Sequence, residues 1–80
     1  MAQSLKDKRM VLRRVKDRLR ALNVAVAEVA HQDLWQRAGL GIVTVATDDT
    51  GASQMLEAAL AEIDRVEPGL VTARQVEYLR

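Results

Sequence analysis

The sequence predicts an α+β domain in which helices cover one face of an antiparallel sheet. Two segments place apolar residues at helical spacing, two short β-branched runs lie between them, and a third such run ends the chain. The predicted order is therefore α-β-β-α-β. One more strand in front would make it the ferredoxin-like β-α-β-β-α-β sandwich, with sheet order 4-1-3-2. We therefore expect a ferredoxin-like arrangement without its first strand, which would be central in the sheet.

The first helix is predicted from about residue 4 to residue 22. Ser4 is expected to cap it by accepting a hydrogen bond from the Asp7 amide, and Asn23 to end it in a left-handed conformation. Its apolar residues fall within an arc of about 120°, which predicts one buried face. They are Leu5, Val11, Leu12, Val15, Leu19 and Leu22.

Two strands are predicted at residues 24–30 and 40–47, joined as a hairpin through the long connection 31–39. The second run is almost continuously apolar, so we expect it to be covered on parts of both faces and to lie inside the sheet. Gly39 and Gly41 indicate a bulge or a close backbone approach near Trp35.

The second helix is predicted at about residues 50–66, with Asp48 or Asp49 as its N-cap and Pro68-Gly69 at its end. A terminal strand is predicted at residues 70–79. The buried face of the helix is expected to consist of Ala52, Met55, Leu56, Ala59, Leu60, Ile63 and Val66.

Composition favours one cytoplasmic domain over residues 1–80. The chain has no cysteine, which excludes disulfides and thiolate chemistry and favours a reducing compartment. It has no signal-peptide pattern and no run of about 18 apolar residues, so we expect no membrane association. The charge is strongly divided: residues 1–20 hold eight bases and two acids, and residues 21–80 hold four bases and nine acids.

Five bases in the first helix recur at spacings of three and four residues, which predicts one basic stripe about 21 Å long. No acid interrupts this series. The stripe suits phosphates of an RNA backbone, with affinity that falls with salt; the alternative is a solvated helix face. A membrane surface is disfavoured, because the apolar face has no Trp or Phe anchor. The stripe consists of Lys6, Arg9, Arg13, Lys16 and Arg20.

The connection between the strands is the second candidate site, since it holds the only His and the only Trp. Trp35 is able to stack on a base while Gln32 or Arg37 bonds base edges. The structural alternative is that Trp35 closes the core and Asp33 caps the turn. The loop candidates are His31, Gln32, Asp33, Trp35 and Arg37, with Gln36 beside them.

Nothing in the sequence indicates catalysis. His31 and Asp33 have no nucleophile partner, one His among scattered carboxylates lacks metal-ligand spacing, and Gly39-Leu40-Gly41 precedes a strand and is no phosphate loop. We expect no enzyme activity, no cofactor, no metal and no small-molecule substrate.

The segment SLKDKR at residues 4–9 and the run VAVAEVAHQDLWQRAGLGIVTVATDD at residues 24–49 resemble the YlxP-like family of small bacterial proteins, domain of unknown function 503. The resemblance covers residues 4–49, with HQDLWQRA as its most distinctive part. It implies a ferredoxin-like fold in a bacterial cytosolic protein, encoded near translation and ribosome-maturation factors. It also implies a first strand before Ser4, so we expect either codons upstream of Met1 that encode this strand or a truncated protein.

Two functions follow as hypotheses. The first is an RNA- or ribosome-associated binding protein, with the basic stripe contacting phosphates and the 31–37 loop giving selectivity. The second is a protein-interaction or self-association module, because one half of the chain is basic and the other acidic, and because open sheet edges promote association.

Overall fold

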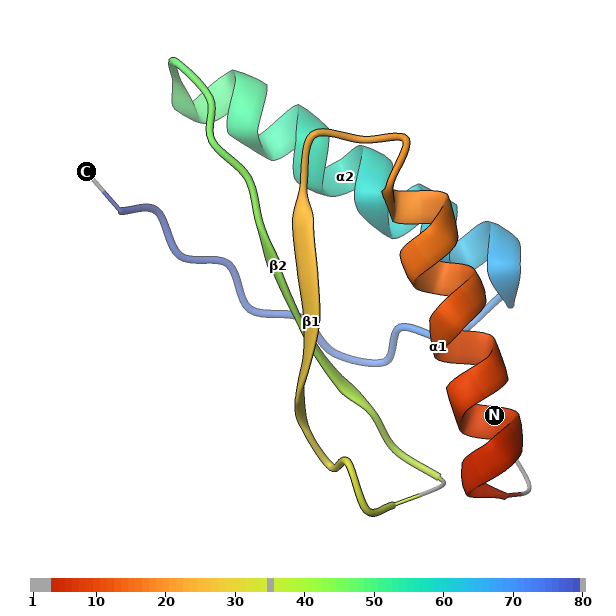
Figure 1. Cartoon of the computed structure of the whole chain (residues 1–80). Helices are drawn as coiled ribbons and strands as arrows, with labels where there is room; N and C mark the ends of the chain where they lie inside the picture. The colour runs from red at the N-terminus through yellow and green to blue at the C-terminus, as the bar shows by residue number, and fades with distance from the viewer. Residues whose placement is uncertain (1–3, 35, 80) are drawn as a thin grey trace.

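The computed structural model describes residues 4–34 and 36–79. Within these residues the chain forms α1 (Leu5–Leu19), β1 (Ala25–Ala30), β2 (Gly39–Val43) and α2 (Asp49–Val66) (Figure 1). The two strands pair with each other in an antiparallel sheet. The predicted α+β class is thus confirmed at the level of two helices and one two-stranded antiparallel sheet.

Both helices begin within one residue of their predicted starts. The Ser4 hydroxyl accepts a hydrogen bond from the Asp7 amide at 3.1 Å, and Oδ1 of Asp48 accepts one from the Gly51 amide at 2.7 Å. Each cap satisfies an amide that has no partner inside the first helical turn. The choice between Asp48 and Asp49 is thereby settled in favour of Asp48 as the N-cap of α2.

The end of α1 differs from the prediction. The helix ends at Leu19, with Arg20 as a right-handed C-cap. Asn23 does not have a positive φ. Hydrogen bonds from Ala21 to Arg18 and from Leu22 to Leu19 tighten the chain into a turn before β1. These short-range bonds satisfy the last carbonyls, so the left-handed cap that we predicted at Asn23 is wrong.

The hairpin has an irregular register at the end nearest the long connection. Glu28 pairs with Leu40 and Ala30 pairs with Gly39, so Val29 is left out as a bulge. A Cβ atom at Gly39 would lie 2.8 Å from Cβ of Ala30. The predicted bulge and close approach are therefore present, but the close approach is to Ala30; Trp35 lies outside the described residues.

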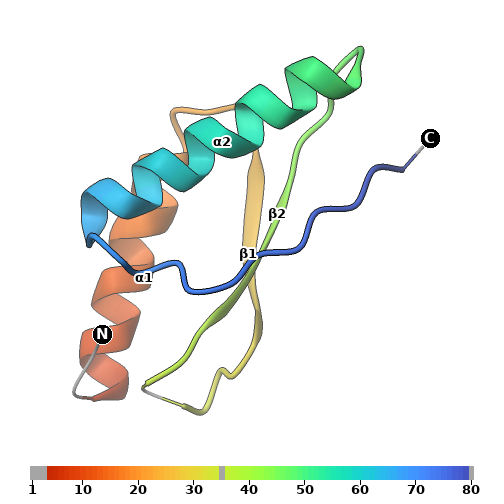
Figure 2. The ribbon, with the colours of Figure 1, turned by 180° about the vertical axis from the view of Figure 1, so that it is seen from behind.

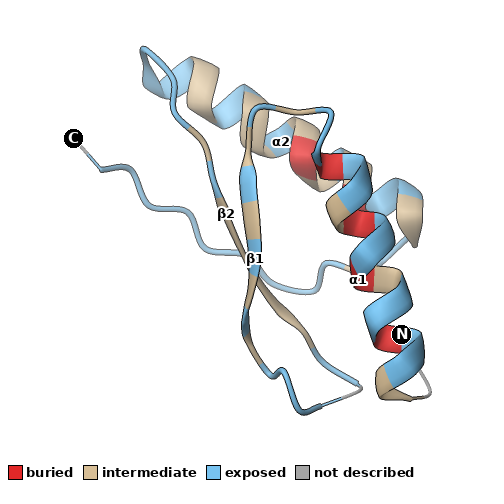
Figure 3. Cartoon of the chain, viewed as in Figure 1, coloured by how far each residue is buried: buried red, intermediate tan, exposed pale blue. Residues whose placement is uncertain are grey.

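The core lies where α1 and α2 cross over one face of the sheet (Figures 2 and 3). Its buried cluster is formed by two residues from each helix, and apolar residues of both strands pack against it. Because strand side chains alternate, the even-numbered positions of β1 and β2 face the helices. The cluster is Val15, Leu19, Ala59 and Ile63, with Val24, Val26, Leu40, Ile42 and Leu60 among the residues packed against it.

The opposite face of the hairpin is open to solvent. Val29 and Val43 are each 65% exposed, and Val45 is 81% exposed. We predicted a strand at residues 40–47 covered on parts of both faces and lying inside the sheet, and this is wrong: β2 ends at Val43, and the described helices pack on one face. Continuous apolarity there does not reflect burial on both sides.

The predicted terminal strand at residues 70–79 is also wrong. Residues 71–79 carry no regular secondary structure and are all exposed. They leave α2 and run past the hairpin as an extended trace (Figures 1 and 2). Among the described residues no backbone hydrogen bond joins them to β1 or β2. Apolar residues at strand spacing form a strand only when a neighbouring edge supplies hydrogen bonds.

Candidate functional site

A cleft of about 260 Å³ lies between α1 and β1, and most of the predicted basic stripe lines it. Four of the five predicted bases contribute to its walls, whereas Lys6 is exposed on α1 outside them. Helical spacing brings these four residues to one side of α1. The lining residues are Arg9, Leu12, Arg13, Lys16, Asp17, Arg20 and Glu28.

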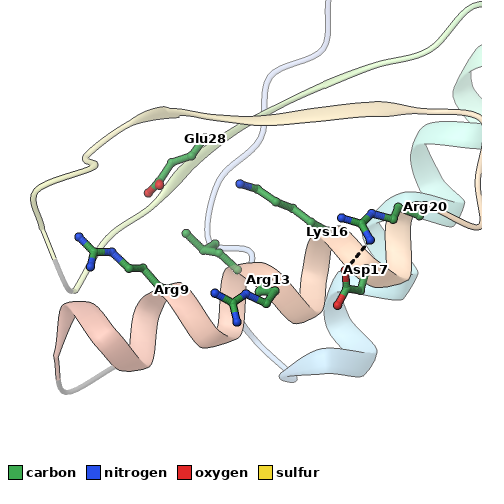
Figure 4. A pocket seen from close by; sticks show the side chains of 7 residues that line it. Arg9, Arg13, Lys16, Asp17, Arg20 and Glu28 are labelled. Carbon is green, nitrogen blue, oxygen red and sulfur yellow. Dashed lines mark ion pairs between the residues drawn. The ribbon is translucent and has the colours of Figure 1, made fainter.

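The charged side chains of the cleft come from both walls. Arg9 and Lys16 extend from α1 toward β1, and Glu28 extends from β1 toward α1 (Figure 4). The hairpin therefore contributes a carboxylate to a cleft in which four of the lining residues are basic. The sequence pattern of α1 alone does not reveal this carboxylate.

The cleft also contains an acid from α1, although the predicted stripe itself has none. Asp17 also lines the cleft, and its Oδ1 lies 3.2 Å from Nη1 of Arg20. The spacing of three residues places the two side chains next to each other on the helix. Arg20 is therefore partly neutralised. Within residues 4–34 and 36–79, no acid forms an ion pair with Arg9, Arg13 or Lys16.

Lys8 lies near this cleft; it is one of the eight bases in residues 1–20 and was not among the predicted site residues. It is 1% exposed. Its Nζ lies 2.9 Å from Oε2 of Glu28 and donates hydrogen bonds to the carbonyl oxygens of His31 at 2.5 Å and Leu34 at 2.6 Å. A signal was present in the sequence: Lys8 precedes Leu12 by one helical turn, in line with the buried face of α1.

Glu28 has an unusual environment for a carboxylate that borders a cleft. Its side chain is 20% exposed, and its Oε2 is buried without a hydrogen bond of normal geometry. The contact with Lys8 at 2.9 Å is thus an ionic contact between two charges and not a well-aligned hydrogen bond. The negative charge of Glu28 depends on Lys8 for compensation.

The loop residues are held next to α1 but do not line the basic cleft. His31 has a φ of 59°, in the left-handed region, and its carbonyl accepts hydrogen bonds from Lys8 and from the Leu34 amide. Gln32 donates to the Glu28 carbonyl at 3.1 Å. Gln32, Asp33 and Arg37 are exposed, and Trp35 lies outside the described residues.

A second hollow, a groove of about 970 Å³, separates β2 from the extended residues 70–77. His31, Gln36 and Arg37 line it together with apolar side chains of β2 and α2. The structure therefore places the described loop candidates His31 and Arg37 at this groove, and the basic stripe at the other cleft. The apolar lining includes Leu12, Leu40, Ile42, Leu56, Leu60 and Leu70.

The described residues contain no group of three or more His, Cys, Asp or Glu side chains that could hold a metal ion. Neither described helix combines the length and the apolarity that crossing a membrane requires. The chemistry that the site does offer is electrostatic: fixed positive charges beside a compensated carboxylate.

Comparisons with known proteins identify the family to which the chain is similar. A family described as a protein of unknown function (DUF503) matches residues 1–76. The chain is 41% identical over 64 residues to the uncharacterized protein YlxP of Bacillus subtilis (strain 168). The aligned segment covers 79% of this chain and 70% of that protein. No solved structure matches the chain. The chain therefore belongs to the YlxP-like DUF503 family.

Proposed function

We propose that this protein is a non-enzymatic binding protein that associates with RNA, free or in the ribosome, through the cleft between α1 and β1. The observation that carries the proposal is the grouping of Arg9, Arg13 and Lys16 in one cleft without an acidic partner among the described residues. A surface helix that only maintains solubility usually pairs or alternates its charges.

The dimensions of the cleft suit a short stretch of phosphate backbone. Arg9 and Lys16 are seven residues apart, which corresponds to about 10.5 Å along the helix axis. Arg13 lies between them, so the three cations can meet neighbouring phosphates of one strand. Arginine presents a planar fork of donors to phosphate oxygens, which adds geometry to the charge attraction.

The lining of the cleft supports affinity more than sequence selection. Among the residues that the structure describes, the lining contains no aromatic side chain, so these residues offer bases no stacking platform. Contacts to phosphates position a nucleic acid but do not distinguish its bases. We therefore propose RNA binding that depends on salt and depends little on sequence.

The experiment compares two variants with the same loss of charge. In the cleft variant, Arg9, Arg13 and Lys16 are all changed to Gln; in the control variant, Lys6, Arg14 and Arg18 are changed to Gln. The control residues lie on α1 but do not line the cleft. Binding to a fluorescein-labelled single-stranded RNA is measured by anisotropy at several KCl concentrations.

We expect the cleft variant to bind at least about tenfold more weakly, and the control variant to lose less than about threefold. With three fewer phosphate contacts, the slope of log K against log [KCl] should fall by about 2. Equal losses in the two variants would mean that net charge alone attracts RNA. That result, or a wild-type protein that binds no RNA at low salt, would refute the proposal.

The second candidate is self-association, and the groove beside β2 favours it. One side of this groove is β2, whose free edge bonds to no other described strand, and the other is the extended segment 70–77. A ferredoxin-like sheet would place its central strand between them, and an extended segment of a second copy fits the same place. The opposite charges of the two chain halves support it less, because Glu57 and Glu62 pair within the chain with Arg74 and Arg65.

Light scattering during size-exclusion chromatography tests this second candidate. A mass that doubles over about a hundredfold range of concentration supports it, because association follows mass action. A monomer mass throughout would exclude it and would leave RNA binding unaffected.

A further inference from the structure

The ammonium group of Lys8 is surrounded by three oxygen atoms: one forms an ion pair with it and two accept hydrogen bonds from it. They are Oε2 of Glu28 at 2.9 Å and the carbonyls of His31 at 2.5 Å and Leu34 at 2.6 Å. Lys8 is 1% exposed, so water does not compete for these contacts. A buried lysine with two hydrogen bonds and an ion pair is held in place, unlike the flexible lysines of a surface.

We propose that Lys8 is the fixed counter-ion of Glu28 and that it thereby sets the affinity of the cleft for anions. This inference rests on the proposed function, since it concerns the same cleft. Lys8 does not line the cleft, whereas Glu28 does. Lys8 is therefore a positioning residue that acts on a bound anion through Glu28.

The reason lies in the charge of Glu28. A carboxylate in the wall of a phosphate-binding cleft repels the ligand, and this repulsion is stronger in a partly dehydrated site than in water. Arg9 and Lys16 extend toward the same space as Glu28 (Figure 4). Lys8 cancels the carboxylate from the protein side, so that the positive charges on α1 remain available to the ligand.

The two carbonyl contacts explain why the counter-ion stays where it is. Lys8 could otherwise turn outward and bind the phosphate directly, or Glu28 could pair with Lys16 and block the cleft. The carbonyls of His31 and Leu34 anchor the ammonium on the side of the hairpin connection. The same contacts join this connection to α1, which gives the turn at residues 31–34 a fixed place.

The proposal predicts that two single substitutions change the affinity for anions in opposite directions. Glu28→Gln removes the repelling charge and leaves that of Lys8, so binding of anions should tighten at least about threefold. Lys8→Met keeps an unbranched side chain, one atom shorter, but leaves Glu28 uncompensated, so binding should weaken at least about threefold. The double variant should return close to the wild-type affinity, because both charges of the pair are then absent.

A purely structural role for Lys8 would not give this pattern. Loss of folding lowers binding in Lys8→Met, and Glu28→Gln can reverse it by removing the uncompensated charge, but it does not make Glu28→Gln alone bind more tightly than wild type. Lys16→Met is the matched control, since Lys16 also faces the cleft but forms no ion pair with Glu28 among the described contacts. Its effect should add to that of Glu28→Gln with much less coupling than the effect of Lys8→Met.

A second readout does not depend on any ligand. The Leu34 amide donates to the His31 carbonyl, which is one of the two carbonyls that Lys8 holds. Hydrogen exchange of this amide should be at least about tenfold faster in Lys8→Met and close to the wild-type rate in Glu28→Gln. Equal exchange in Lys8→Met and wild type would show that Lys8 is not anchored as described and would overturn the proposal.

Affinities are measured with two probes, a single-stranded RNA and inorganic polyphosphate, each with the full 80-residue chain and its variants. With either probe, the proposal is supported if the two single variants change the affinity in opposite directions and the double variant recovers the wild-type affinity. If polyphosphate binds and RNA does not, the proposed function fails and the counter-ion role is decided on polyphosphate. Binding without opposite signs refutes the counter-ion role alone, and a wild-type protein that binds neither probe refutes both.

Discussion

Ala30 and Gly39 face each other across the irregular end of the hairpin, and they leave no space for a second methyl group. A Cβ atom built on Gly39 would lie 2.8 Å from Cβ of Ala30 and 3.4 Å from its Cα. These neighbours belong to the backbone or are fixed to it, so they cannot rotate away. Gly39 is thus required by close packing, and its place next to the bulge at Val29 fixes how the 31–38 connection leaves the sheet.

Gly39→Ala should therefore lower the free energy of unfolding by about 1–3 kcal/mol, the usual range for an overpacked site. Gly41→Ala is the control, because its Cβ would lie 3.2 Å from Cγ1 of Val29, a side chain that is 65% exposed and free to move. We expect a smaller loss there. Urea denaturation followed by circular dichroism measures both, and equal losses would contradict the role of the Ala30 contact.

The two helix caps should differ in strength. Ser4→Ala removes a neutral hydrogen bond of 3.1 Å, and we expect a loss of about 1 kcal/mol in the free energy of unfolding. Asp48→Ala removes a shorter bond of 2.7 Å and a negative charge beside the positive end of the α2 dipole, so the loss should be larger. Asp48→Asn retains an acceptor and should recover part of it. Urea midpoints that are unchanged in Asp48→Ala would show that this cap is unimportant.

Features governed by local chemistry were predictable from the sequence. The caps at Ser4 and Asp48 and the buried face of α2 follow from residue types at fixed spacings. The terminal strand did not form, although Val71, Val76 and Tyr78 have strand propensity. Strand formation depends on a partner edge, and no partner edge can be read from the segment itself.

The candidate site was predictable on one wall only. Helical spacing predicts that Arg9, Arg13 and Lys16 lie on one side of the helix, and in the structure all three line one cleft. The contribution of Glu28 depends on how the hairpin packs against α1, which local spacing does not determine. Lys8 could have been recognised from its position one turn before Leu12, but a lysine on a buried face needs a partner, and that partner comes from the tertiary fold.

Two of the loop candidates, His31 and Arg37, give a prediction of their own, because they line the groove beside β2 and not the basic cleft. If the cleft provides the affinity, His31→Ala and Arg37→Ala should change the RNA affinity by less than about threefold. A single-stranded DNA of the same sequence should bind within about threefold of the RNA, because phosphates are common to both. Anisotropy titrations at one salt concentration measure these ratios. A loss of tenfold or more in either variant would instead assign the loop a direct part in binding.

The two faces of the hairpin can be tested at neighbouring positions of β2. Ile42 packs against the helix core, whereas Val43 is 65% exposed on the opposite face. Thr is close in shape to Val and retains β-branching, so Val43→Thr should change the free energy of unfolding by less than about 0.5 kcal/mol. Ile42→Thr places a hydroxyl among apolar side chains and removes a methylene contact, so we expect a loss of about 1–3 kcal/mol.

Urea denaturation decides between the two faces. A large loss of stability in Val43→Thr would mean that the exposed face is covered, either by a second copy of the chain or by another segment. Repeating the Val43→Thr measurement at low and high protein concentration separates these two causes, since only association between copies depends on concentration.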